Sequence, residues 1–435
     1  MTTKLKTKLV EKKYLLTFIL ITSLFALWGF ANDITNPMVA AFQTIMELSA
    51  TKASFVQLAF YGGYATMAIP AALFVRRYSY KSGILLGLAL YAIGAFMFIP
   101  AAAYQEFSFF CISLYVLTFG LAFLETTANP YILSLGSEET STRRLNLSQA
   151  FNPMGSLLGM FVASKLVLAS LESDSEAVRS VGFSTLDEAT KATIRANDLD
   201  IIRNPYVALG CVVVLMFIII AIFVKKQDNA QEKVEHAKLG ETIKRLFNNK
   251  VYREGVVAQV FYVAAQIMCW TFIIQYADNL GINKEDAQMY NIFAMGMFLC
   301  SRFICTFLMK YVNSRVLLTI FAIGGMATSA GTILIVGKVG LYCLIATSAF
   351  MSLMFPTIYG IALENVSRKD STLGAAFLVM AIVGGALMPP LQGRIIDMKE
   401  VFSLPAVNFS FILPFICFFV ISIFGYRSYK SMGNK

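Results

Sequence analysis

The stretches ALWGFANDITNPMVAAF (residues 26–42) and YVLTFGLAFLETTANPYIL (residues 115–133) are apolar runs that each contain one carboxylate, Asp33 and Glu125. A charged side chain at the centre of a bilayer costs roughly 2.5–3.5 kcal/mol on insertion scales, so acids within membrane helices usually face a polar cavity and mark a substrate or proton path. The alternative is that either acid lies near a helix end and reaches water between the lipid headgroups. We therefore expect a membrane transporter.

The composition indicates a polytopic, all-α membrane protein. Of its 435 residues, 57% are hydrophobic and 14% are charged, and apolar runs of about 20 residues, enough to span a bilayer as a helix, recur along the chain. Twelve transmembrane helices are predicted, at about 15–43, 53–75, 82–103, 107–135, 147–170, 205–224, 255–277, 289–309, 316–336, 339–363, 372–393 and 405–426. The first and fourth are longer than a span requires, so tilt, protrusion into water or kinks at Pro37 and Pro130 must absorb the surplus.

Positive charge is distributed unevenly over the predicted loops. When alternate loops are assigned to opposite sides, 25 of the 36 Lys and Arg residues fall on the side of both termini and nine on the other. Because cytoplasmic loops are enriched in Lys and Arg, the N- and C-termini are expected in the cytoplasm. The net charge of +10 is thus explained by membrane topology. No nucleic-acid partner is expected, and the lipid bilayer is the expected surroundings.

The longest polar break divides the chain into two halves. We predict an N-terminal six-helix bundle at residues 1–224, a cytoplasmic linker at 225–253 and a C-terminal six-helix bundle at 254–435. Basic residues recur in corresponding loops after the second and eighth spans, which is weak internal similarity, and repeats of this kind build a central site between the halves. A second polar break, 171–204, is expected outside, with room for a short surface helix around 185–198.

Several other functional classes lack their motifs in this sequence. The only histidine, His236, lies in the predicted linker, and the seven cysteines lie in predicted spans with no CxxC pair, so no metal site is expected. No GxxxxGK[ST] phosphate-binding motif occurs, which argues against ATP-driven transport. We expect no cofactor and an ion gradient as the energy source.

Enzymatic activity and catalytic residues are not expected either. An intramembrane hydrolase would need a nucleophile with its base, or a metal cluster, and the sequence shows neither at a suitable spacing. A solute channel or a sensor is the other alternative. It would be distinguished by flux that does not saturate or by the absence of accumulation.

Sequence segments in both halves carry a family resemblance. In the first half they are GFANDITNPMVAAFQ (29–43), QLAFYGGYATMAIPAALFVRRYSYKSG (57–83), FGLAFLETTANPYIL (119–133) and RRLNLSQAFNPMGSLLG (143–159), and more loosely in the second half CSRF (300–303), FPTIYG (355–360) and MAIVGGALMPPLQG (380–393). These segments resemble the fucose–proton symporters of the major facilitator superfamily, in the fucose/glucose/galactose symporter family. The resemblance covers essentially the whole first half.

The resemblance implies a fold, an activity and a location. The fold would be twelve helices in two pseudo-symmetric six-helix bundles, the major facilitator fold, in a bacterial inner membrane. The activity would be import of L-fucose or a related hexose by alternating access, coupled to protons. The open alternatives are a proton- or sodium-coupled galactose/glucose transporter of the same family and an uncoupled facilitator. A monomer is expected, since one chain with two halves has all that alternating access needs.

The resemblance also assigns roles to residues. Asp33 and Glu125 fall where the family keeps its two membrane carboxylates, whereas Asn32, Gln149 and Asn152 fall on polar cavity positions. Asp33 is implied as the principal proton site, and Glu125 as a residue that both binds the sugar and titrates. One departure is Phe355, where the family pattern has a tyrosine before Pro-Thr-Ile. It removes a hydroxyl near the expected sugar site and leaves the choice of sugar open.

The chemistry of these residue types agrees with such roles. A carboxylate in a low-dielectric site is more easily protonated near neutral pH, so it can gain or lose a proton as the site opens to either side. Hexose hydroxyls each donate and accept hydrogen bonds, and Asn and Gln supply both functions in one planar group. Asn129 is a further amide, although it precedes Pro130 and can instead satisfy backbone at a kink.

Aromatic and cationic side chains complete the predicted site. Phe298, Trp28 or Trp270 can stack on the apolar face of a sugar, the alternative being ordinary packing or interface anchoring. Arg302 is the one cation deep in the second half of the sequence, and a buried arginine needs a partner. Its expected partner is Glu125 or a backbone carbonyl across the cavity, and such a pair can act as a gate. The alternative is that Arg302 caps its own helix or packs against a loop.

Overall fold

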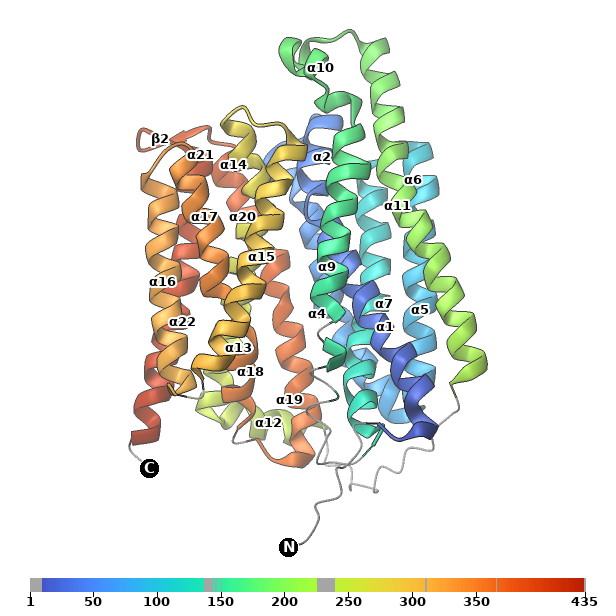
Figure 1. The fold of residues 1–435 in the computed structure, drawn as a ribbon, viewed down its shortest axis with the longest axis vertical. Coiled ribbons are helices and arrows are strands. Elements are labelled where there is room, and N and C mark those ends of the chain that lie inside the picture. Colours follow the sequence, from blue (N-terminus) through green and yellow to red (C-terminus); the bar gives the residue numbers. More distant parts are fainter. Residues whose placement is uncertain are drawn as a thin grey trace, which may run out of the picture.

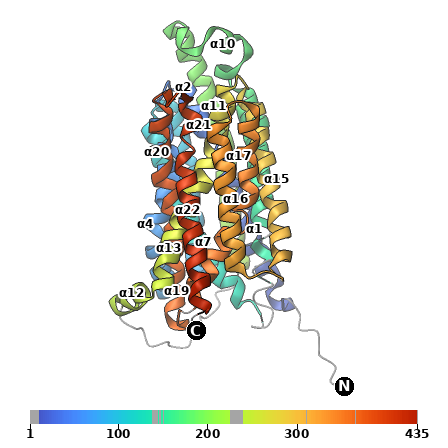
Figure 2. The same cartoon turned by 90° about the vertical axis from the view of Figure 1, so that its left-hand side faces the viewer.

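The computed structural model describes residues 10–136, 144, 147–149, 151–224, 239–309, 311–364 and 366–433. His236 and residues 225–238 of the predicted linker lie outside the described residues. Within the described part, nearly all residues are helical, and the helices run side by side in two groups (Figure 1). The view from the side shows the same near-parallel array (Figure 2).

The first half of the chain forms one of these groups. Its helices are α1 Leu15–Thr35, α2 Met38–Ile45, α3 Ala50–Ala53, α4 Phe55–Arg77, α5 Tyr80–Phe96, α6 Phe98–Tyr104, α7 Phe107–Ser134, α9 Phe151–Val162, α10 Glu176–Val181 and α11 Glu188–Phe223. Short 3-10 and π-helical turns extend α9 from Ala163 to Ser170.

The second half forms the other group. Its helices are α12 Leu239–Asn248, α13 Lys250–Thr271, α14 Ile273–Asn279, α15 Lys284–Leu308, α16 Ser314–Leu334, α17 Lys338–Met351, α18 Met354–Leu363, α19 Arg368–Met380, α20 Gly384–Ile396, α21 Ala406–Phe409 and α22 Ile412–Gly433. The strands β1 Glu400–Val401 and β2 Leu404–Pro405 pair antiparallel, with Glu400 opposite Pro405.

The array has the twelve predicted transmembrane segments. Eleven helical segments of the described residues are long and apolar enough to cross a membrane. The twelfth, α15, is less apolar but has 25 residues and lies in the same array, packed against α17. The predicted all-α fold of two six-helix bundles is therefore confirmed, while the residue boundaries given for the halves and the linker stay a prediction.

Pro37 lies at a break in the first span, whereas the helix that contains Pro130 is continuous. The first span is interrupted between α1 and α2, at Asn36 and Pro37, as predicted from its length and its proline. In contrast, α7 continues through Pro130 to Ser134. Residues 188–198 are helical, close to the predicted surface helix at 185–198, but they continue without interruption into the sixth span, because α11 is one helix of 36 residues that contains Pro205. Its N-terminus is capped by Asp187, whose carboxylate accepts from the Thr190 backbone N–H at 3.0 Å.

Close contact between α1 and α9 depends on two glycines. A Cβ built on Gly155 would lie 1.9 Å from the carbonyl oxygen of Ala26, and one built on Gly29 would lie 2.1 Å from that of Asn152. Any larger residue would push the helices apart, as is common where membrane helices meet at small residues. This close approach places the polar residues of α9 directly beside α1.

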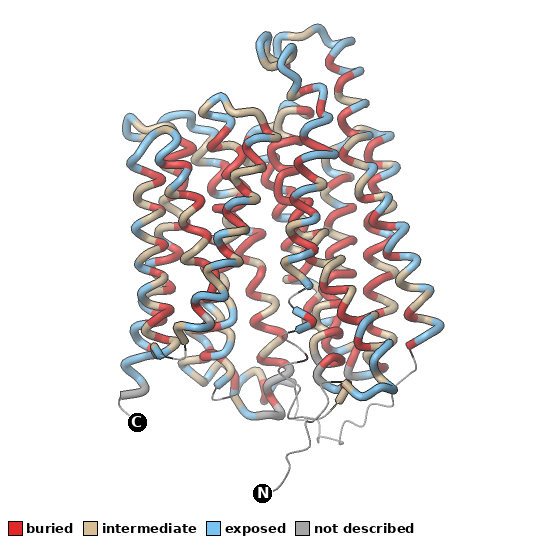
Figure 3. Tube along the Cα trace, viewed as in Figure 1, coloured by how far each residue is buried: buried red, intermediate tan, exposed pale blue. Residues whose placement is uncertain are grey.

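The two ends of the array differ, and we name them by the residues they carry. The terminal end carries the short turn Lys12–Tyr14 before α1 and the C-terminal end of α22, and the cap end, opposite to it, carries residues 171–187 and 278–284 (Figure 1). Buried residues concentrate between the helices, and exposed residues cover the outside (Figure 3). Many outward residues are large and apolar, among them Ile93, Phe161, Ile222, Phe303 and Leu334. Such a surface is suited to lipid.

Candidate functional site

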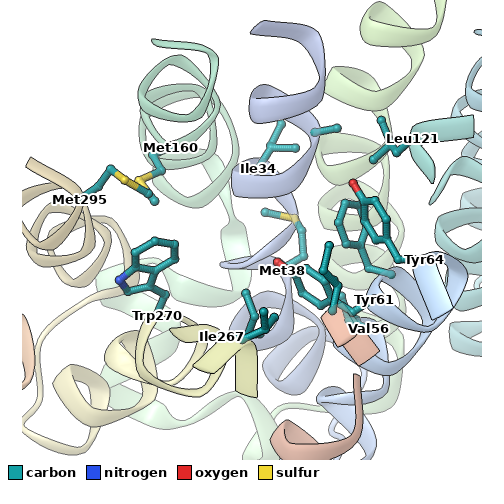
Figure 4. Packing of buried hydrophobic residues seen from close by; sticks show 14 of the residues in the cluster. Ile34, Met38, Val56, Tyr61, Tyr64, Leu121, Met160, Ile267, Trp270 and Met295 are labelled. Carbon is teal, nitrogen blue, oxygen red and sulfur yellow. The ribbon is translucent and has the colours of Figure 1, made fainter. Parts of the chain in front are cut away.

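A cavity of about 200 Å³ lies in the middle of the array and is lined by residues of both halves. From the first half it is lined by Trp28, Asn32, Asp33, Tyr61, Tyr64, Glu125, Asn152, Pro153 and Ser156, and from the second half by Tyr262, Val263, Gln266, Ile267, Trp270, Met295, Phe298, Arg302, Phe355 and Ile382. Figure 4 shows part of this region, where Met295 of the second half lies beside Met160 of the first, and Ile267 of the second half lies near Met38 and Val56 of the first.

Asp33 is almost completely removed from water, with 1% of its surface exposed. It lies near the C-terminal end of α1, and its Oδ1 accepts from Asn36 Nδ2 at 3.1 Å. The described ion pairs include none that involves Asp33. A buried carboxyl group with an amide donor beside it, at a cavity lined by both halves, can exchange a proton when water reaches it.

Glu125 reaches the same cavity from α7 and is partly buried. One turn further along α7, Asn129 donates its amide to the backbone carbonyl of Glu125 at 3.0 Å. Asn129 also accepts from Gln149 Nε2 at 3.3 Å. Asn129 thus bonds to the backbone of its own helix. Neither Asn129 nor Gln149, which is exposed, is among the residues that line the cavity.

The predicted amides at 32 and 152 both line the cavity. Asn32 accepts from the Tyr61 hydroxyl at 3.0 Å, which joins α1 to α4. Asn152 donates to the carbonyl of Phe25 at 3.3 Å, a contact that follows from the glycine-mediated approach of α9 to α1. Each side chain is therefore oriented by a neighbouring helix and keeps further hydrogen-bonding capacity for a solute.

Aromatic rings and one guanidinium form the wall of the cavity in the second half. The rings of Phe298 and Trp270 meet edge to face with centroids 5.2 Å apart, and the Arg302 guanidinium lies 4.8 Å from the Phe298 ring centroid. Arg302 Nε also donates to the backbone carbonyl of Ser352 at 3.2 Å. This carbonyl belongs to the break between α17 and α18, so Arg302 satisfies backbone at a helix interruption within its own half.

Phe355, the departure from the family pattern, lines the cavity as well. Its ring centroid lies 6.0 Å from that of Tyr262 on α13. The Tyr262 hydroxyl is buried and has no hydrogen-bond partner among the described residues. The family pattern has a tyrosine hydroxyl at this position of α18. In this chain a hydroxyl is present beside Phe355 on the neighbouring helix α13.

Two further cavities lie on opposite sides of the central one. A cavity of about 420 Å³ is formed by the second half toward the terminal end, and it shares Arg302 with the central cavity. Its other polar residues include Arg315 and Glu364, which form an ion pair. A cavity of about 690 Å³ at the cap end is lined by both halves, including Gln43, Glu47, Gln275, Asn279 and Lys284.

Sequence reasoning missed the tyrosines of α4. Tyr61 and Tyr64 line the cavity, and Gln57 one turn earlier is completely buried. Their spacing of four and three residues puts all three on one helix face, a signal that was available within the segment 57–83. Among the described residues, no group of three or more His, Cys, Asp or Glu side chains is placed to hold a metal ion.

Comparison with known proteins gives concordant matches. Residues 19–389 match the family described as Major Facilitator Superfamily. The L-fucose-proton symporter of Haemophilus influenzae (strain ATCC 51907 / DSM 11121 / KW20 / Rd) is 64% identical over 425 residues, 97% of this chain and 99% of that protein. The glucose/galactose transporter of Brucella abortus biovar 1 (strain 9-941) is 30% identical, covering 97% of this chain and 96% of that one. The crystal structure of FucP in the outward conformation, a Major Facilitator Superfamily transporter, is similar with a TM-score of 0.72 and 31% identity, over 96% of this chain and 99% of that one.

Proposed function

This chain belongs to the Major Facilitator Superfamily, and the relatives that it matches are transporters and not enzymes. We propose that it is a proton-coupled importer of L-fucose that works by alternating access. The observation that carries the proposal is the central cavity, which both halves line and at which Asp33 is 1% exposed. The 64% identity to the L-fucose-proton symporter of Haemophilus influenzae supports L-fucose as the substrate. The proton gradient supplies the energy, and no cofactor takes part.

The cavity residues divide into two roles in this proposal. Asp33 is the principal proton site because it is the more deeply buried acid, and Glu125 binds the sugar and titrates with its occupancy. Asn32 and Asn152 bind sugar hydroxyls, while Phe298 packs against the apolar face of the ring. Tyr262 adds a free hydroxyl on the side of Phe355. Gln149 contributes if it moves from its exposed position toward the cavity during transport.

Arg302 is proposed as a gate between two compartments. It lines both the central cavity and the cavity toward the terminal end. Its guanidinium is held by the Phe298 ring and the Ser352 carbonyl. A movement of Arg302 away from these groups, for example toward Glu125, would change access from the central cavity to the terminal end.

The orientation in the membrane follows from the loop charges. We place the terminal end in the cytoplasm and the cap end in the periplasm, because 25 of the 36 basic residues of the sequence fall on the side of the termini when the predicted loops are assigned to alternate sides. The protein then resides in the cell inner membrane as a multi-pass monomer. Its partners are the sugar, protons and lipid, with residues 1–224 and 254–435 as the two moving bundles and 225–253 as the cytoplasmic linker.

A galactose or glucose transporter of the same family is the second candidate. Phe355, at a cavity position where the family pattern has tyrosine, leaves the choice of sugar open, and the resemblance to the Brucella abortus protein favours this candidate. Sodium coupling would keep the same architecture. An uncoupled facilitator would not need a buried acid at the cavity, so the burial of Asp33 argues against it.

The test is uptake of labelled L-fucose into proteoliposomes with an inward proton gradient. We expect uphill uptake by the wild type and its loss in Asp33→Asn, with counterflow exchange retained. The matched control is Asp200→Asn, the same change at an acid with 54% of its side chain exposed and outside the cavity. Accumulation of galactose or glucose in place of fucose would correct the substrate, and sugar uptake that ignores the gradient would refute symport.

A further inference from the structure

Four buried side chains form a chain of hydrogen bonds from Asp33 across the boundary between the halves. Asp33 Oδ1 accepts from Asn36 Nδ2 at 3.1 Å, and Asn36 Oδ1 accepts from Gln57 Nε2 at 3.2 Å. The same Gln57 nitrogen donates to Thr271 Oγ1 at 3.0 Å. Asn36, Gln57 and Thr271 each have at most 1% of their surface exposed. The Gln57–Thr271 bond joins α4 of the first half to α13 of the second.

The position of this bond along the helices separates two cavities. On α4, Gln57 lies one turn before Tyr61, which lines the central cavity. On α13 and α14, Ile267 lines the central cavity, Thr271 follows one turn later, and Gln275 lines the cap-end cavity one turn beyond. On α1 and α2 the same order holds for Asp33, Asn36 and Ala40. The three helical segments therefore place the hydrogen-bonded residues between the two cavities.

We propose that Asn36, Gln57 and Thr271 form a periplasmic seal that keeps water of the cap-end cavity away from Asp33 and so couples closure of the cap end to protonation of Asp33. This inference rests on the proposed function for the role of Asp33. Closing the seal dehydrates Asp33, and an ionised carboxylate resists dehydration far more than a neutral one. The protonated carrier closes, and the ionised carrier opens to the periplasm.

Hydrogen bonds link the seal directly to the carboxylate of Asp33. Asn36 is shared between Asp33 and Gln57, so a change at Asp33 is felt directly at the residue that crosses to the second half. Gln57 has a single described partner in the second half, Thr271, and its Oε1 is buried without a partner. Once the Thr271 hydroxyl is lost, the Gln57 amide retains only the Asn36 contact among the described hydrogen bonds, and that contact does not join α4 to α13.

Other ionisable groups near Asp33 can also respond to pH, and they must be separated from it. Tyr61 and Tyr64 on α4, Glu125 on α7, Tyr262 on α13 and Arg302 on α15 line the same cavity, and Tyr206 on α11 bonds to Thr35 beside it. The polar residues that α9 presents there, Asn152 and Ser156, are neutral. Glu125 is the other carboxylate that lines this cavity, so Glu125→Gln is a necessary comparison.

The test measures how fast a cysteine at position 267 reacts with a membrane-impermeant thiol reagent added from the periplasmic side. Ile267 lines the central cavity below the seal, so Ile267→Cys reports opening of the cap end without any sugar. Chains that keep only the native cysteines give the background. Since a thiol itself titrates, each rate is divided by that of Asp33→Asn in the same Ile267→Cys chain at the same pH.

We expect the normalised rate of the parent to rise between pH 5.5 and pH 8. Thr271→Val removes the hydroxyl at nearly constant volume, and it should raise the rate at pH 5.5 by about threefold to tenfold, as loss of one buried hydrogen bond would. It should also flatten the pH dependence, because water then reaches Asp33 in both states. Gln57→Leu should behave alike, and Thr271→Ser should restore the parent. Glu125→Gln should keep the pH dependence.

The matched control is Thr332→Val, the same substitution at a fully buried threonine whose hydroxyl bonds to the Thr328 carbonyl in its own helix. It should label like the parent. Parent-like labelling of both Thr271→Val and Gln57→Leu would overturn the seal, as would equal flattening in Thr332→Val. If one variant fails to fold, the other decides. A wild type that transports no sugar would contradict the proposed function, while the labelling result would still decide the seal.

Discussion

The cap end and the terminal end of the array are held together by different contacts. Three ion pairs of the described residues join the first half to the second, all at the cap end: Asp174–Lys284, Arg179–Asp278 and Lys165–Glu285. At the terminal end, the described ion pairs Arg245–Asp370, Arg315–Glu364 and Arg427–Glu254 stay within residues 239–433. There the halves meet through packing of α4 on α19. The terminal end can therefore open without breaking a described ion pair, whereas the cap end cannot.

Asp174 is the centre of the cap-end contacts. Its carboxylate accepts from Lys284 Nζ at 2.8 Å, from the Lys284 backbone N–H at 2.9 Å and from Arg179 Nη1 at 2.9 Å. The side chains of Asp174 and Lys284 are only 5% and 6% exposed. This arrangement, together with the seal around Thr271, indicates that the structure is closed on the cap side.

The largest effect is expected for Asp174→Asn. Removing one charge from a buried ion pair costs roughly 3–5 kcal/mol, because the partner charge is left unpaired. We expect periplasmic labelling of Ile267→Cys to rise by more than about tenfold, and uptake to fall because the closed state is lost. The measurement is the labelling rate in vesicles. An unchanged rate would show that the ion pairs do not hold the cap end shut.

A smaller effect is expected for Lys165→Met. Lys165 and Glu285 also join the halves at the cap end, but their side chains are 44% and 33% exposed. Exposed pairs contribute little, because solvent screens them, so the labelling rate should change by about twofold at most. The same assay applies, with Asp174→Asn as the reference. An effect of Lys165→Met as large as that of Asp174→Asn would mean that charge, and not burial, decides which pairs close the cap end.

The sequence predicted the parts of this comparison that depend on local pattern. Apolar length predicts the spans, Pro37 predicts the break after α1, and the cost of a buried charge singles out Asp33 and Glu125, which the structure brings to one cavity. The face of α4 with Gln57 and Tyr61 was equally readable from its spacing. These features follow from properties of one helix at a time.

The contacts that decide the state of the transporter could not be predicted in this way. Asp174 and Lys284 are 110 positions apart, and the sequence around an acid in a loop does not indicate which basic residue it pairs with. The Gln57–Thr271 bond likewise depends on how the two halves dock. The continuous helix α11 was missed because Pro205 reads as a start signal, although the packed array holds it inside a helix. Gln149 was assigned to the site by resemblance alone, and in the structure it is exposed.

The smallest effect on cap-end opening is expected for Asp370→Asn at the terminal end. Arg245 binds the Asp370 carboxylate with two hydrogen bonds, of 3.0 Å and 2.8 Å, and thereby lowers the pKa of that carboxyl from 3.8 to about 2. Arg245 on α12 and Asp370 on α19 both lie in the second half, so the labelling rate of Ile267→Cys should stay at the parent value. What should change is thermal stability.

The pH dependence of that stability follows from the direction of the shift. Because the folded pKa is lower than the unfolded one, the carboxylate stabilises the fold above about pH 4, and this contribution disappears as the pH falls toward 2. Asp370→Asn should lower the apparent melting temperature at pH 7 by about 2 °C or less, and the difference from the wild type should vanish toward pH 2. Arg245→Met should lower the melting temperature by the same amount, and the double variant should lower it no further, because both changes remove the same ion pair. A cap-end labelling rate raised by either variant would contradict this prediction, because it would show that a pair confined to the second half is coupled to the cap end.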